Sequence, residues 1–317
     1  MNESSFLSED GLTILLFHGV IEEQRHRVRN YIGKHLEKSQ FVALVEWLKA
    51  HGTALSMDQV VERHRAREAF PARSFAITFD DGFENNHSIA APIMAALQLP
   101  ATFYVTTDFV DRNAMSWIDR IEHAVEQARQ PTLRLPWSKK TLGLVTTPEK
   151  IVALEAIRAR VKQTPGVDVE ALVAGVAEQC RAEAVVSSDD PLDRKMTWAQ
   201  VRELAENPLF TVGGHSHAHA TLSFLSPSEL ESELDRSLAL LRERAGLAVT
   251  HYAYPEGQVH CYSPEVIAAL KARGIVCCPT AMAGVNTIDT DLFELRRIMP
   301  TPSCVSQIAP EPTVCAE

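Results

Sequence analysis

Short apolar runs that alternate with longer helical patterns constrain the fold of this chain more than any other feature. Such alternation is typical of βα units, in which helices cover a parallel sheet. Several of the runs are bounded by glycine or proline, as buried strands tend to be. The predicted strands are residues 13–17, 75–78, 102–105, 210–212, 251–254, 275–278 and 295–298. The predicted fold class is therefore α/β.

The stretch from about residue 113 to 195 interrupts the alternation. It is rich in Ala, Glu, Arg and Val, shows no strand pattern and carries no candidate ligand motif. We interpret it as a mostly helical insertion in a single domain that covers residues 1–317. Its role as a lid, a dimer surface or simple bulk stays open at this point. The tail after about residue 300 is expected to be poorly ordered.

The composition is that of an ordinary globular protein, with 317 residues, 45% hydrophobic and 23% charged. A net charge of -10 argues against a general nucleic-acid binder, whose phosphate contacts need a basic face. The first ten residues lack a basic segment followed by an apolar one, and the run at 12–17 is too short to span a bilayer. We therefore expect a cytoplasmic protein without a membrane span; nothing in the sequence sets its oligomeric state.

Two adjacent carboxylates follow one predicted strand, in the segment Thr-Phe-Asp-Asp-Gly at 78–82. Gly82 lets the chain turn after Asp80 and Asp81. Adjacent side chains leave a strand in opposite directions, so the two acids need not do the same job. The alternative interpretation is a plain turn, because Asp-Asp-Gly is common turn chemistry.

Three histidines lie within five residues, in His-Ser-His-Ala-His at 215–219. On a helical turn, His215 and His219 share one face and His217 is only a neighbour. On an extended segment all three share one face and form a three-histidine site. Imidazoles combined with a carboxylate leave positions open for water and substrate on a divalent metal. Together the two motifs point to metal-assisted hydrolysis.

At these motifs the chain resembles the polysaccharide deacetylases of carbohydrate esterase family four. The resemblance rests on TFDDG at 78–82, HSxxH at 215–219 and AYPEG at 253–257, with weaker support at 16–20, 100–105 and 195–198. It covers about 12–112 and 195–300, and it leaves the insertion unexplained.

The resemblance implies a distorted (β/α)7-type barrel and a metal held by Asp81, His215 and His219. The metal is expected to be zinc, with Co²⁺, Ni²⁺ or Mn²⁺ as alternatives. Asp80 matches the family's catalytic base, which activates a water. The implied substrate is a carbohydrate with an N-acetylated sugar, and Tyr254, Pro255 and Arg297 are candidates for binding it.

Two features of the family pattern are missing. Many members carry an arginine in the third motif that orients the base, and this chain has Ala253 there. Many also carry a late histidine as general acid, but no histidine follows His260. His18, at the end of the first predicted strand, is our candidate for the acid, and Arg297 is a candidate partner for Asp80.

Three functions therefore remain in competition. The first is removal of an N-acetyl group from an amino sugar in a glycan or a glycan precursor. The second is removal of another acyl group, such as formyl. The third is a catalytically silent carbohydrate-binding relative, which the missing residues favour. Without a leader sequence, a nucleotide-linked or lipid-linked precursor is the expected substrate rather than a finished polymer.

Overall fold

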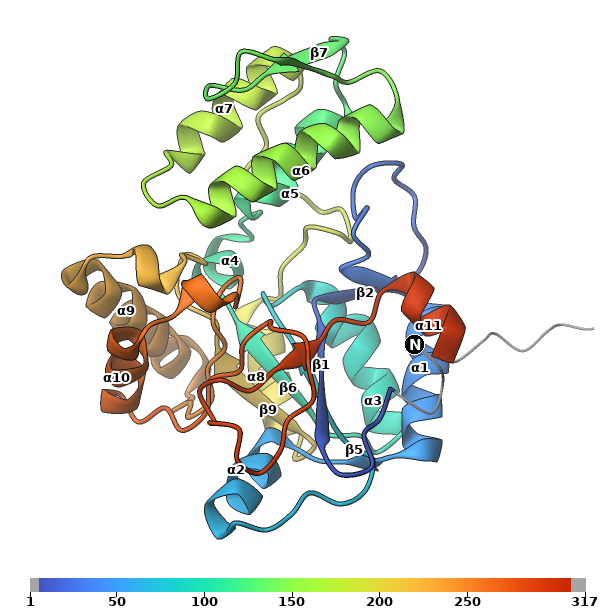
Figure 1. The fold of residues 1–317 in the computed structure, drawn as a ribbon, viewed down its shortest axis with the longest axis vertical. Coiled ribbons are helices and arrows are strands. Elements are labelled where there is room, and N and C mark those ends of the chain that lie inside the picture. The colour runs from blue at the N-terminus through green and yellow to red at the C-terminus, as the bar shows by residue number, and fades with distance from the viewer. Residues whose placement is uncertain (1–5, 309–317) are drawn as a thin grey trace, which may run out of the picture.

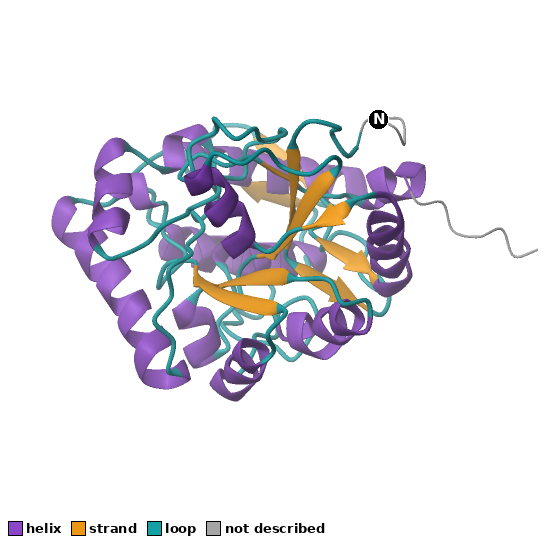
Figure 2. Ribbon diagram, turned by 90° about the horizontal axis from the view of Figure 1, so that it is seen from below, coloured by secondary structure: helices purple, strands orange, loops and turns teal. Residues whose placement is uncertain are grey.

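The computed structural model describes residues 6–308, and its centre is a parallel β-sheet that curves around a common axis (Figure 1, Figure 2). The five strands of its continuous path are, in spatial order, β10 (Arg297–Ile298), β1 (Leu12–Phe17), β5 (Ser74–Phe79), β6 (Ala101–Val105) and β9 (Phe210–Gly214). A short strand, β4 (Thr53–Ala54), pairs with the beginning of β5. All of these pairs are parallel, as the predicted βα units require.

Irregular segments close the sheet into a barrel. Parallel bridges join β9 to Tyr252 and His251 to Cys277. The chain then returns to β10, where the Thr280 N–H donates to the Leu295 carbonyl at 2.8 Å. The prediction of a distorted (β/α)-type barrel is confirmed. The strands predicted at 251–254 and 275–278 are nevertheless isolated bridges, because each segment pairs over only one or two residues.

Helices surround the barrel, and their ends follow local sequence signals. Ser226 accepts the Glu229 N–H at the start of α9, and Gly246 ends that helix in the left-handed conformation, as predicted. The α-helices of the barrel part are α1 (Lys38–His51), α2 (Met57–Ala66), α3 (Ala91–Ala96), α4 (Thr107–Arg112), α8 (Trp198–Glu206), α9 (Pro227–Ala245), α10 (Pro264–Ala272) and α11 (Pro302–Ile308). Single helical turns of other types are η2 (Asn86–Ala90), η3 (Leu222–Phe224) and η4 (Val259–Cys261).

The central strands β1 and β5 are buried along their whole length, on both faces, and most of their side chains are apolar. On the outer face, Phe17 of β1 and Phe79 of β5 pack against Phe41 of α1, with ring centroids 5.4 and 6.0 Å apart. On the opposite face, Ile14 and Ala76 belong to a second apolar cluster. This burial holds the strand ends rigidly, which is what a site built on them requires.

The insertion folds as a unit with its own apolar core and lies over one end of the barrel (Figure 1). It consists of α5 (Trp117–Glu126), β7 (Thr132–Arg134), β8 (Thr141–Gly143), α6 (Thr147–Gln163) and α7 (Val169–Cys180). The expectation that it contains no strand was wrong, since β7 and β8 form an antiparallel pair. Strands of three residues are too short to show an alternating pattern in the sequence.

Two further elements border the insertion and the barrel. A parallel pair, β2 (Gly19–Ile21) and β3 (His35–Glu37), is connected by a long loop at 22–34. The predicted poorly ordered tail was wrong for residues 302–308, which form α11 because Val305 and Ile308 are buried in the same cluster as α1. Residues 309–317 lie outside the described part. Between residues 6 and 308, no helix combines the length and the apolar character that crossing a membrane requires.

Close packing at the end of β9 depends on glycine. A Cβ at Gly213 would lie 2.6 Å from a Tyr104 ring carbon and 2.8 Å from the His251 carbonyl oxygen. We expect Gly213→Ala to lower the free energy of unfolding by about 1–3 kcal/mol, the usual cost of overpacking. Denaturant unfolding of the purified variant measures this change.

Gly175→Ala is the matched control, because Gly175 lies inside α7 and a Cβ there meets no atom within 4 Å. It should stabilise the protein by about 0.5–1 kcal/mol, the usual gain of alanine over glycine in a helix. Equal effects of the two changes would contradict the packing argument.

Candidate metal centre and active-site cavity

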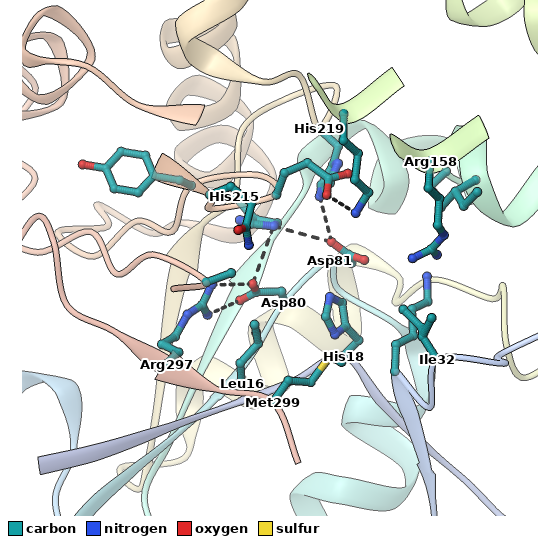
Figure 3. Close-up of a pocket in the computed structure, with 18 of the residues that line it drawn as sticks. Leu16, His18, Ile32, Asp80, Asp81, Arg158, His215, His219, Arg297 and Met299 are labelled. Atoms are coloured by element: carbon teal, nitrogen blue, oxygen red, sulfur yellow. Dashed lines mark hydrogen bonds and ion pairs between the residues drawn. The ribbon is translucent and has the colours of Figure 1, made fainter. Parts of the chain in front are cut away.

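The candidate site lies at the carboxyl ends of the barrel strands (Figure 3). His18 directly follows β1, Asp80 and Asp81 follow β5, and His215 follows β9. Parallel strands bring their carboxyl ends to the same edge, so residues far apart in the sequence converge there. The expectation that His18 shares a rim with Asp80 agrees with this arrangement, since both line one cavity.

The two acids point in different directions because the chain turns sharply between them. Asp80 still continues the strand pairing, since its N–H donates to the Phe17 carbonyl at 2.9 Å. Asp81 then adopts a left-handed backbone with φ of 75°, and Gly82 follows with φ of 85°. Both carboxylates are buried. Asp80 bonds Arg297 and lies 3.8 Å from His215 Nε2, whereas Asp81 lies close to both His215 and His219, so the turn gives the two acids different surroundings.

Arg297 holds the Asp80 carboxylate with two parallel hydrogen bonds. Its Nη1 and Nη2 donate to Asp80 Oδ1 and Oδ2, both at 2.8 Å. The guanidinium is 1% exposed and also donates to the Thr280 carbonyl and the Thr78 hydroxyl. Burial alone would raise the pKa of Asp80, but that pKa lies below its usual value, and the charge of Arg297 is the largest cause that lowers it. Arg297 therefore contacts the acid, as proposed for its candidate partner; it also lines the cavity, so its assignment as a substrate-binding residue stays a prediction.

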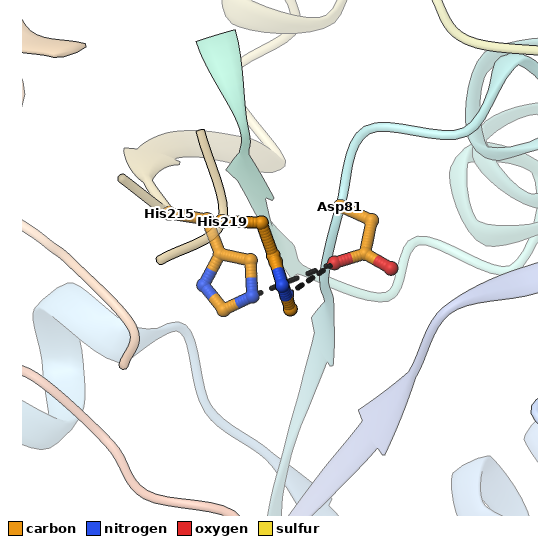
Figure 4. A group of neighbouring side chains, drawn as sticks. All are labelled: Asp81, His215 and His219. Carbon is orange, nitrogen blue, oxygen red and sulfur yellow. Dashed lines mark ion pairs between the residues drawn. The ribbon is translucent and has the colours of Figure 1, made fainter. Parts of the chain in front are cut away.

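His215, His219 and Asp81 bring three metal-ligating atoms together (Figure 4). Asp81 Oδ1 lies 3.5 Å from His215 Nε2 and 3.2 Å from His219 Nε2. His215 Nδ1 lies 2.9 Å from the Ala253 carbonyl, an acceptor only, so Nδ1 carries the proton and the Nε2 lone pair faces the site. Burial lowers the pKa of His215, which favours the neutral form that binds metals.

The histidine segment is neither a helical turn nor a strand, so both predicted local geometries were wrong. It is an irregular loop in which Ser216 and His219 have φ of 64° and 57°. The Glu233 carboxylate accepts the N–H groups of His217 and Ala218 and so holds the loop in place. The His217 ring bonds the Thr107 hydroxyl at 3.0 Å and is outside the group of possible ligands.

These residues fit a divalent metal. Two imidazoles and one carboxylate are typical ligands of a catalytic zinc site, which keeps a position open for water. Asp81 Oδ1 is buried and accepts no hydrogen bond from any residue between 6 and 308. A buried acceptor without a hydrogen bond is costly, and a cation bound between Asp81 and the two histidines would satisfy it.

His18 lines the same cavity, and its Nδ1 has no hydrogen-bond partner among residues 6–308. Burial lowers the pKa of His18 to about 4, although the nearby charges of Asp81 and Asp80 oppose that shift. The imidazole is therefore neutral near pH 7. It can give a proton to a leaving group only after it has received one during the reaction.

The other candidates take less direct positions. Tyr254 is 1% exposed and donates its hydroxyl to the Phe293 carbonyl at 3.1 Å, so only part of it reaches the cavity. Pro255 is buried and is not among the residues that line the cavity. His260 binds the Lys162 carbonyl at 2.7 Å and also lies outside that lining.

The insertion completes the cavity, which has a volume of about 250 Å³. Trp117 of α5 and Arg158 and Lys162 of α6 form part of its wall, so the insertion is more than bulk. Sequence reasoning missed these residues and also Lys34 and Glu256. Among these five residues, Glu256 is the one that belongs to a recognised motif, since it follows Pro255 in AYPEG. The others had no local signal: the packing of the insertion brings Trp117, Arg158 and Lys162 to the cavity, and the loop between β2 and β3 brings Lys34.

The family profile described as "Polysaccharide deacetylase" matches residues 67–277, which is more than half of the chain. That stretch contains both carboxylates, the histidine loop and the insertion.

Solved structures of low sequence identity share the fold. IcaB from Ammonifex degensii superposes with a TM-score of 0.61 at 19% identity, covering 96% of this chain and 98% of that one. The Streptococcus pyogenes deacetylase PplD, solved with acetate, gives a TM-score of 0.58 at 15% identity, covering 96% and 100%.

Relatives of known function match over shorter stretches. A poly-beta-1,6-N-acetyl-D-glucosamine N-deacetylase of Staphylococcus aureus (strain MSSA476) is 30% identical over 94 residues, which is 30% of this chain and 31% of that protein. The Escherichia coli (strain K12) protein of the same name is 27% identical over 106 residues, 33% of this chain and 15% of its own length. These matches cover only part of each relative. The profile match, which covers more than half of the chain and contains both motifs, shows that the chain belongs to the polysaccharide deacetylase family.

Proposed function

We propose that this protein is a metal-dependent hydrolase that removes the N-acetyl group from an amino sugar in a glycan or a glycan precursor. One observation carries the proposal: Asp81, His215 and His219 converge in a cavity where Asp80 lies beside them, held by Arg297. The names of the partial relatives, which are N-deacetylases of an N-acetylglucosamine polymer, support this choice of acyl group.

Asp81, His215 and His219 would hold the metal, for which we propose zinc. When bound, a divalent metal polarises the amide carbonyl and makes a water more acidic. The Asp80 carboxylate accepts a proton from the attacking water, whose oxygen forms the new bond to the carbonyl carbon. The carbon–nitrogen bond then breaks, acetate leaves and the sugar amine takes up a proton. His18, neutral at rest, is proposed to receive the proton that Asp80 took from the water and to pass it to that amine, which returns both side chains to their starting state.

The competing functions have less support. A silent binding protein was favoured by the missing base-orienting arginine, but Arg297 contacts Asp80 in the way such a residue must. Removal of a formyl group would use the same catalytic residues, and comparing acetylated with formylated sugars as substrates distinguishes the two.

The metal assignment predicts that His215→Ala loses bound metal, because one of three ligands is removed. Elemental analysis of the purified protein measures the metal-to-protein ratio. His217→Ala is the matched control and should keep its metal, since His217 bonds Thr107 instead. Equal metal content in wild type and His215→Ala would refute the assignment.

The base assignment predicts that Asp80→Asn lowers kcat by roughly 100-fold or more, the usual scale for a positioned proton acceptor. Arg297→Lys should also lower kcat, because an ammonium group cannot make the two parallel hydrogen bonds. Both variants should keep their metal, which elemental analysis checks. Turnover near the wild-type level in Asp80→Asn would exclude this residue as the base.

The assignment of His18 predicts different effects on two kinds of substrate. An amine leaves poorly until it is protonated, whereas nitrophenolate leaves without help. His18→Gln should therefore slow deacetylation of an N-acetyl sugar strongly and hydrolysis of nitrophenyl acetate only weakly. Steady-state rates on both substrates measure the difference, and equal losses would point to a structural role.

A further inference from the structure

Three cationic side chains line the cavity from outside the barrel strands. Lys34 comes from the loop between β2 and β3, and Arg158 and Lys162 come from α6. Residues four apart lie on the same face of a helix, so both α6 cations face the same way. We call Lys34, Arg158 and Lys162 the cationic wall.

The carboxylate partners of the first two cations lie behind them. Lys34 Nζ is 2.7 Å from Asp119 Oδ1, and Arg158 Nη2 is 3.1 Å from Glu122 Oε1. Asp119 and Glu122 are buried in α5, and neither lines the cavity. Lys34 and Arg158 therefore present their positive ends to the cavity, while their carboxylate partners lie outside its lining.

Lys162 is held differently. Its ammonium group pairs with Glu256, which also lines the cavity, and its carbonyl accepts a hydrogen bond from His260. These contacts tie the end of α6 to the barrel loop that follows Pro255. Lys162 is thus fixed in place, and 30% of its side chain stays accessible.

Arg158 has unused hydrogen-bonding capacity. A guanidinium has five N–H donors, and the bond from Nη2 to Glu122 is the single hydrogen bond that residues 6–308 provide to this side chain. Its Nε is buried and has no partner within the same range, so the donors left for a ligand are those of the two Nη atoms. Figure 3 shows Arg158 on the side of Asp81 away from Arg297, so it does not contact the proposed base.

A neutral sugar does not require such a wall. Neutral hydroxyl and amide groups are satisfied by neutral donors and acceptors, whereas cations in a partly buried site interact most strongly with an anion. Arginine in particular binds carboxylate and phosphate groups through two N–H donors at once. Although each cation of the wall has a carboxylate partner, the free donors of Arg158 suit a ligand that carries a negative charge.

We propose that the cationic wall binds a carboxylate or phosphate group on the amino sugar whose acyl group is removed. The preferred substrate is then an anionic amino sugar, and Arg158 is the main residue that determines this specificity. The inference rests on the proposed function, because it concerns the same cavity. It adds a class of substrate that the family resemblance does not specify.

Calorimetric titration tests the inference without relying on turnover. N-acetylglucosamine, its 6-phosphate and N-acetylmuramic acid are the three ligands, one neutral, one with a phosphate and one with a carboxylate. We expect at least one anionic ligand to bind wild type roughly 10-fold or more tightly than the neutral sugar, the scale of one charge-assisted hydrogen bond. The tighter of the two anionic ligands shows which group the wall accepts.

Arg158→Gln should abolish the preference for the anionic ligand. Arg160→Gln is the matched control and should keep the preference for the anionic ligand. Arg160 is on the same helix as Arg158, but it lies over the Trp137 ring and outside the cavity. Arg158→Gln leaves Glu122 without its partner, so the double variant Glu122→Gln/Arg158→Gln provides a neutral replacement for the pair. It too should lose the preference.

Equal affinity of wild type for neutral and anionic sugars would overturn the inference, as would an Arg158→Gln variant that still prefers the anion. Parallel assays of deacetylation distinguish a failure of this inference from a failure of the proposed function. Turnover of neutral and anionic sugars at the same kcat/KM would leave the function intact and refute the specificity. Binding of the anion through Arg158 without any deacetylation would support the wall and refute the function.

Discussion

The buried ion pair between Asp80 and Arg297 connects the early and the late part of the chain at the centre of the site. Removing two charges from water is costly unless their hydrogen bonds are satisfied, and here both carboxylate oxygens have a donor. The remaining guanidinium donors reach the Thr280 carbonyl and the Thr78 hydroxyl. Those groups belong to different segments of the barrel. The pair is therefore satisfied only when the barrel is closed, and the position of the acid depends on the complete fold.

The backbone turn at Asp81 places the two carboxylates in different surroundings. With Asp80 held by Arg297, the left-handed turn at Asp81 directs the second carboxylate towards His215 and His219. Left-handed conformations are unfavourable for most residues and persist where the surrounding structure holds them. The histidine loop uses the same device at Ser216 and His219. Local strain thus serves to place ligand atoms that a regular helix or strand would place differently.

The insertion converts the open end of a barrel into a bounded cavity. Its helices pack around an apolar cluster that is separate from the apolar clusters of the barrel. Ion pairs connect the two parts: Lys34 with Asp119, and Lys162 with Glu256. The acidic face of α5 also holds the loop at 22–34, since Glu126 accepts the N–H groups of Val28 and Arg29. The barrel carries the proposed reaction, and the insertion contributes the wall that we propose selects the substrate.

The sequence by itself determined the fold class and the chemistry of the proposed metal ligands. Buried parallel strands are continuous apolar runs, and helix caps are local, so both can be recognised in short segments. The donor types in TFDDG and HSHAH are equally local. The sequence offered Arg297 as a candidate partner for Asp80, and the tertiary structure decided that these two residues, 217 positions apart, form the pair. The tertiary structure also placed the ligand atoms and assembled Lys34, Arg158 and Lys162. Irregular loops and distant contacts leave no periodic pattern in a sequence, since they depend on how whole elements pack.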